Sequence, residues 1–138
     1  MKRTPIKARS PKKRKQGHCD TLYSQIVRSR GFCELCGRTD AQLHCHHLIA
    51  RSATFFRHNL ENGICLCSRC HIFNNGSHAS GEPPSISAHG TPIAFNDWLR
   101  DNNPDKHAWY EKNRWNVIKG ERIDYDRVYE MLKEQANG

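Results

Sequence analysis

The sequence has no long hydrophobic run. Its mean hydropathy is −0.85, and no stretch approaches the roughly 20 apolar residues that a membrane-spanning helix needs. The basic start of the chain is not followed by the apolar segment of a secretory signal peptide. We therefore expect no membrane partner and no secretion.

The sequence also lacks acidic side chains near its start. Residues 1–17 hold eight of the 22 Lys and Arg residues and none of the 14 Asp and Glu residues. The rest of the chain therefore has equal numbers of basic and acidic side chains, and this segment carries the net charge of +8. Its prolines and scarce apolar residues predict a disordered basic tail. Such a tail can contact DNA phosphates, or it can be a solvated arm that only aids solubility. The candidate DNA contacts are Lys12, Lys13, Arg14 and Lys15.

A chain of 138 residues is long enough for one modest domain, and the sequence has no internal repeat. We expect this domain over residues 18–138, with a core at 32–79, a Gly-, Pro- and Ser-rich loop at 80–91 and helices at 92–136. Apolar periodicity and capping residues predict helices and two strands, at residues 20–31 (helix), 42–50 and 64–68 (strands), and 68–76, 91–102, 103–115 and 124–135 (helices). The predicted fold class is α+β.

Cysteine is present in an odd number, seven, and several cysteines are paired at short spacing among histidines. This pattern indicates metal binding rather than a disulfide framework. Two Cys-x-x-Cys pairs separated by 30 residues can supply the four thiolates of a tetrahedral structural zinc. The alternatives are buried free thiols or a redox pair. The predicted zinc ligands are Cys33, Cys36, Cys67 and Cys70, and the remaining cysteines, Cys19, Cys45 and Cys65, are expected to be small buried residues.

Histidines are concentrated in "LHCHHLIARS", residues 43–52, where His46 and His47 are adjacent. Neighbouring side chains on an extended strand point to opposite faces, so these two histidines would need different roles in one site. Asn62 follows in the sequence, and His71 comes directly after the second cysteine pair.

In this order the chain resembles the HNH endonuclease superfamily. The matching segments are "CHHLI" and "NGICLCSRCH", within roughly residues 32–78. The resemblance is closest to the four-cysteine subgroup common in phages and bacteria. It implies a small zinc-stapled ββα-metal core, here with a short N-terminal helix and additional C-terminal helices.

The resemblance implies a role for each of these residues. His46 is expected to bind a catalytic divalent metal, and His47 to be the general base that takes a proton from the attacking water. Asn62 is expected to tie the loop between the strands and help to orient the base. His71 is expected to be a second metal ligand, at the start of a helix.

The third protein ligand of this metal is left open by the sequence. His78 is favoured because it lies two helical turns beyond His71 and histidine is the commoner ligand. Asn75, one turn beyond His71, and His58 are the alternatives. By default, surface or core positions are expected for His44, His58, His89 and His107.

The metal and the DNA contact are further expectations. Many family members have Asp where this chain has His46, and an all-imidazole site favours Mn²⁺, Ni²⁺, Co²⁺ or Zn²⁺ over Mg²⁺. Arg51 lies near the site in sequence and is a candidate phosphate contact, although a lone Arg is as often a surface charge.

The resemblance implies a metal-dependent endonuclease that hydrolyses DNA phosphodiester bonds in a bacterial cytosol or nucleoid, by nicking as a monomer or by double-strand cleavage as a homodimer. The alternative is a non-catalytic zinc module that binds DNA, for example a regulator. In that case His46 and His71 would join Cys45 or Cys65 in a closed second zinc site.

Overall fold

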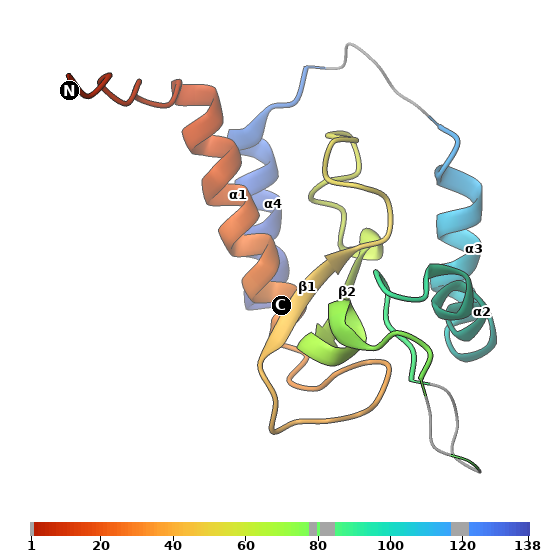
Figure 1. Cartoon of the computed structure of the whole chain (residues 1–138). Coiled ribbons are helices and arrows are strands. Elements are labelled where there is room, and N and C mark those ends of the chain that lie inside the picture. Colours follow the sequence, from red (N-terminus) through yellow and green to blue (C-terminus); the bar gives the residue numbers. More distant parts are fainter. Residues whose placement is uncertain (1, 78–79, 81–84, 117–121) are drawn as a thin grey trace.

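A two-stranded antiparallel hairpin lies at the centre of the molecule (Figure 1). The structure is a computed structural model, and it describes residues 2–77, 80, 85–116 and 122–138. Strand β1 (Leu43–His47) pairs with β2 (Gly63–Cys67), and His46 stands opposite Ile64. A short π-helical segment, η2 (Arg69–Phe73), follows β2 directly. This strand–strand–helix element, with helices around it, confirms the predicted α+β class.

Two pairs of helices flank the hairpin (Figure 1). The chain order is α1, β1, a single 3₁₀ turn η1, β2, η2, α2, α3 and α4. Helices α1 and α4 lie side by side at one flank, and α2 and α3 lie at the other. Their bounds are Pro11–Arg28 for α1, Leu60–Asn62 for η1, Pro92–Asn102 for α2, Pro104–Asn113 for α3 and Tyr125–Asn137 for α4.

Strand β2 divides the core because successive side chains of a strand point to opposite faces. Cys65 packs with α1 and α4, in a cluster that includes Tyr23. Ile64 and Leu66 pack on the other face with three of the four paired cysteines and with Phe95 of α2. The hairpin is therefore covered on both faces, and its side chains are held in a fixed register.

Helix α1 begins earlier than the sequence predicts. Its first residue is Pro11, and the Ser10 hydroxyl accepts from the Lys13 backbone N–H at 3.3 Å. Gln16 Nε2 also donates to the Tyr125 hydroxyl of α4 at 2.9 Å. A capped start and a packed partner thus extend the helix toward the N-terminus, so the expected boundary at residue 17 lies inside α1. None of the helices in the described ranges is long and apolar enough to cross a membrane.

Candidate metal centre and active site

The four predicted zinc ligands come together beside the hairpin. Their Sγ atoms lie within 4.8 Å of one another, and none of the four is in a disulfide. Cys36 Sγ lies 3.8 Å from Cys67 Sγ. Two thiolates bound to one tetrahedral zinc at 2.3 Å would be about 3.8 Å apart. Gly37, with φ of 76°, makes the tight turn after the first pair, and its N–H donates to the Cys33 carbonyl at 2.8 Å.

The four thiols can all ionise together only beside a cation. Burial and the neighbouring thiols raise the pKa of Cys70, and burial raises the pKa of Cys36. Burial opposes ionisation of Cys33 as well, but backbone N–H groups that point at its sulfur outweigh that effect and lower its pKa. Four thiolates at this separation repel one another unless a positive ion balances them. The donor set therefore fits a structural zinc.

Three imidazoles form a second cluster. His46 comes from β1, His71 from η2 and His89 from the turn before α2, and one ring nitrogen of each lies within 4.8 Å of the others. His71 Nε2 lies 3.2 Å from His89 Nε2. Two nitrogens bound to one metal at about 2.1 Å in tetrahedral geometry would be about 3.4 Å apart. The spacing of the rings fits one divalent ion.

His89 takes this place because its backbone is bound to η2. Its N–H donates to the carbonyl of His71 at 3.0 Å, and the N–H of Ala88 donates to the carbonyl of Cys70 at 2.8 Å. The sequence offers no periodic signal for this pairing, since His71 and His89 are 18 positions apart. His89 was expected only at the surface or in the core, so it is the site residue that sequence reasoning missed.

The favoured third ligand, His78, lies outside the described residues. Of the two alternatives, Asn75 is exposed, and His58 lies in another network, where its Nε2 is 2.7 Å from an Asp20 carboxylate oxygen. Within the described ranges, the third imidazole of the cluster is His89.

The environment keeps His46 and His71 neutral. Burial, together with the neighbouring imidazoles, lowers the pKa of His46 to about 3 and that of His71 to about 4. Both rings therefore present lone pairs at neutral pH, which is the form that binds a metal.

His44 supports His71 from outside the cluster. It lies on the same face of β1 as His46, because the two are separated by one residue, and its Nδ1 is 3.0 Å from Nδ1 of His71. A neutral His71 that offers Nε2 to a metal carries its proton on Nδ1, and that N–H donates to His44. This contact fixes both the tautomer and the orientation of His71.

His47 occupies a different environment from its neighbour His46. Its Nε2 lies 2.9 Å from the backbone carbonyl of Arg57, and its ring stacks on Tyr23 of α1 with centroids 5.1 Å apart. A carbonyl only accepts, so Nε2 carries the proton and Nδ1 is left with its lone pair. Burial lowers the pKa of His47, partly offset by the Arg57 carbonyl. The ring is thus a neutral, oriented base.

Asn62 ties the loop between the strands. It is fully buried, and its Oδ1 accepts from the Ile49 N–H at 2.6 Å. Its Nδ2 donates to the Ile49 carbonyl at 2.9 Å and to the Phe56 carbonyl at 3.3 Å. The side chain therefore closes the loop that carries Arg57, and the Arg57 carbonyl orients His47.

Helix α1 holds the same loop from the other side. Both carboxylate oxygens of Asp20 bind the Arg57 guanidinium, at 2.8 and 2.6 Å. The Tyr23 hydroxyl donates to the Asn59 carbonyl at 2.8 Å. Burial opposes the ionisation of Asp20, but Arg57 and His58 outweigh it and lower its pKa. The orientation of His47 thus depends on a helix that has no part in the HNH sequence pattern.

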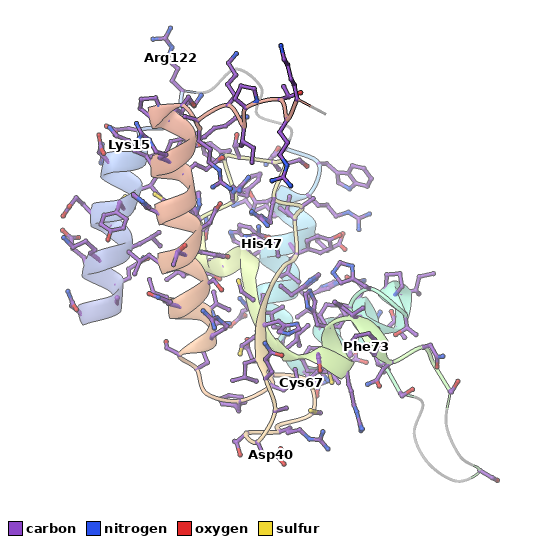
Figure 2. All side chains as sticks on the ribbon, turned by 60° about the vertical axis from the view of Figure 1, so that its left-hand side comes forward. Lys15, Asp40, His47, Cys67, Phe73 and Arg122 are labelled. Carbon is purple, nitrogen blue, oxygen red and sulfur yellow. The ribbon has the colours of Figure 1, made fainter. Side chains whose placement is uncertain are left out.

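One cleft joins the base to the metal cluster. Its volume is about 560 Å³, and it is bounded by β1, η2, α2 and the turn before α2. Figure 2 shows His47 near the middle of the molecule and Cys67 nearer the loop that carries Asp40. The residues of the predicted site that line the cleft, together with His89, are His46, His47, Arg51 and His71.

The four candidate cations of the N-terminal segment lie on α1 and are exposed. Lys15 is paired with Asp126 of α4 through a contact of 2.7 Å. Arg51 stands beside His47 with 60 % of its side chain exposed, and its guanidinium makes one contact with the described residues, a long one of 3.5 Å with Asp20. Arg51 is therefore available to a ligand in the cleft.

The comparison with known families agrees with this geometry. The family model for HNH endonuclease matches residues 33–75, a range that contains the four clustered cysteines, the adjacent histidines, Asn62 and His71. Residues 33–75 thus match the HNH endonuclease family, which confirms over this segment the resemblance read from the sequence. His89, α1 and the C-terminal helices lie outside the match. No curated protein and no solved structure matches the chain.

Proposed function

We propose that the protein is a metal-dependent endonuclease that hydrolyses phosphodiester bonds in DNA. The observation that carries the proposal is the position of His47: it lines the same cleft as the three imidazoles, and its Nε2 is held by the Arg57 carbonyl, so that Nδ1 keeps its lone pair. A base and a metal cluster on one cleft are what phosphodiester hydrolysis requires.

In this reaction His47 Nδ1 takes a proton from a water molecule whose oxygen attacks the phosphorus. The bond to the 3′ oxygen breaks, which leaves a 5′ phosphate and a 3′ hydroxyl. A divalent ion held by His46, His71 and His89 would supply positive charge for the phosphate and leaving oxygens. Asn62 keeps the loop closed, so the carbonyl that orients His47 stays in place.

The ligand set bears on the choice of metal. All three ligands are imidazole nitrogens, with no carboxylate among them. Nitrogen ligands favour Mn²⁺, Co²⁺, Ni²⁺ or Zn²⁺ over Mg²⁺. The same set also bears on the alternative of a closed structural zinc. Cys65 packs on the α1 side of the hairpin, and no described cysteine joins the three imidazoles. A cluster of three protein ligands, which is what the described residues supply, is typical of a catalytic site rather than a structural one.

The family resemblance carries the remaining parts of the proposal: a phage or bacterial DNA-processing enzyme that acts in the bacterial cytosol or nucleoid. One site in each chain would nick DNA as a monomer. Cleavage of both strands would take a homodimer.

The test is cleavage of supercoiled plasmid by protein that retains its zinc but has lost loosely bound ions. Mg²⁺, Mn²⁺, Ni²⁺ and Zn²⁺ are added back separately, and His89→Ala is assayed beside the wild type. Metal-dependent nicking that is lost or strongly weakened in the variant supports the proposal. If no ion restores cleavage to protein that still binds DNA, the chain is a binding module.

A further inference from the structure

A second cavity opens on the α1 side of His47. Its volume is about 360 Å³, and it shares His47, Arg51 and Cys45 with the cleft already described. Its other wall is formed by α1, through Asp20, Thr21, Tyr23, Ser24 and Arg28. The base therefore stands between the metal cleft and a hollow along a helix that the HNH match does not include.

This cavity has an excess of positive charge. Arg28 uses only its Nε, which donates to the Ser24 hydroxyl at 3.1 Å and to the Ser24 carbonyl at 3.3 Å. Its two terminal nitrogens have no partner among the residues that the structure describes. Asp20, the one acid in the wall, is already neutralised by Arg57 through two short contacts. The guanidinium groups of Arg28 and Arg51 are left to bind an anion.

The cavity continues as a stripe toward the start of α1. With 3.6 residues in each turn, the residues that share its face are Lys13, Gly17, Thr21, Ser24 and Arg28, which we call the α1 track. The three residues between the end cations have small side chains, so the surface between them is shallow. A Cβ added at Gly17 would lie 3.7 Å from Nη1 of Arg9, which places another cation near the N-terminal end of the track.

The N-terminal cations divide between two sides of α1. Lys15 is two positions from Lys13, or about 200° around the helix, and it binds Asp126 of α4 at 2.7 Å. Figure 2 shows Lys15 on the side of α1 that faces α4, and His47 on the opposite side. Lys13 therefore belongs to the face that leads to the base, whereas Lys15 does not.

We propose that the α1 track binds the phosphate backbone of the DNA strand that enters the active site. The inference rests on the proposed function, because it takes DNA as the substrate. From Lys13 to Arg28 the helix rises about 22 Å, which is the axial length of about six nucleotides of one strand. Hydroxyl groups and guanidinium groups are among the donors that proteins direct at phosphates. Backbone contacts of this kind position the substrate without reading its sequence.

The test is the salt dependence of DNA binding by the full chain, with zinc retained and no other divalent ion added. A labelled duplex is titrated at several NaCl concentrations with wild type, Lys13→Gln, Arg28→Gln and Lys15→Gln. Lys133→Gln is the matched charge control, because Lys133 pairs with Glu130 on α4. Each phosphate contact that is lost should reduce the slope of log K against log [salt] by about 0.9.

We expect the two track variants, Lys13→Gln and Arg28→Gln, each to lose about 0.9 from the slope. Lys15→Gln should lose less than half as much, and Lys133→Gln should have the wild-type slope. Equal losses of slope for Lys13→Gln and Lys15→Gln would show that both sides of α1 contact DNA alike, which would refute the track. Wild-type slopes for both Lys13→Gln and Arg28→Gln would also refute it. The same proteins are then assayed for plasmid nicking. Nicking by wild type together with unchanged slopes refutes the track alone, whereas the expected slopes without nicking refute only the proposed nuclease.

Discussion

Replacing Asn62 with alanine tests how the loop between the strands is held. Asn62 is fully buried and makes three hydrogen bonds to the backbone of Ile49 and Phe56. Asn62→Ala leaves one N–H and two carbonyl groups without these partners. At about 1 kcal/mol for each bond, the free energy of unfolding should fall by roughly 3 kcal/mol. For a chain of this length, that corresponds to a fall in Tm of roughly 10 °C.

The same substitution should also affect cleavage. Asn62 closes the loop that carries the Arg57 carbonyl, and that carbonyl orients His47. At a temperature where the variant is folded, we expect the rate of plasmid nicking to fall at least about tenfold, equivalent to about 1.4 kcal/mol.

Asn59→Ala is the matched control, because Asn59 is exposed and its side chain accepts only from the Glu61 N–H. It should lower the free energy of unfolding by about 1 kcal/mol, as the loss of a helix cap does. The measurements are thermal unfolding by circular dichroism and single-turnover nicking. An Asn62→Ala protein with the Tm of Asn59→Ala and the wild-type rate would refute the role given to Asn62.

Three further predictions concern the metal sites and pH. Cys70→Ser should release zinc and unfold the hairpin, as measured by zinc content and near-ultraviolet circular dichroism. A variant that stays folded without zinc would contradict the structural role of the zinc site. His44→Leu should weaken Co²⁺ binding at the imidazole cluster by about 10–100-fold, as measured by spectroscopic titration. His44→Gln can still accept a hydrogen bond from His71, so it should recover part of the lost affinity. Equal Co²⁺ affinities for the two variants would refute the role of this contact. In the absence of added divalent ion, the free energy of unfolding should fall as the pH drops from about 6.5 toward 4. The pKa values of His46 and His71 are lowered in the folded protein, so the unfolded chain takes up protons first. The measurement is the urea midpoint at each pH, and midpoints that rise as the pH drops would contradict the prediction.

Much of the hairpin and its cysteine cluster follows from local sequence signals. Alternation predicted strands at residues 42–50 and 64–68, and β1 and β2 lie inside or within one residue of them. The two Cys-x-x-Cys pairs predicted one four-thiol cluster, and the structure brings the four together. These features can be predicted from the sequence because each depends on residues that are close together in it.

The remaining parts depend on contacts between distant segments. The start of α1 is stabilised by α4, through Gln16 and Tyr125, which are more than one hundred positions apart. His89 reaches the metal cluster through backbone hydrogen bonds to η2, although it is 18 positions from His71 in the sequence. The pairing of Asp20 with Arg57 likewise joins α1 to the loop between the strands. None of these contacts has a periodic or spacing signal, so one sequence cannot reveal them.

The most direct test of the central claim is single-turnover cleavage of supercoiled plasmid by His47→Ala, with the metal that best supports the wild type. Co²⁺ binding is measured on the same protein, because His47 is not among the three clustered imidazoles. If His47 is the general base, the variant binds metal and DNA as the wild type does but cleaves at least about 100-fold more slowly. Cleavage at the wild-type rate by a metal-loaded His47→Ala protein would show that another group takes the proton.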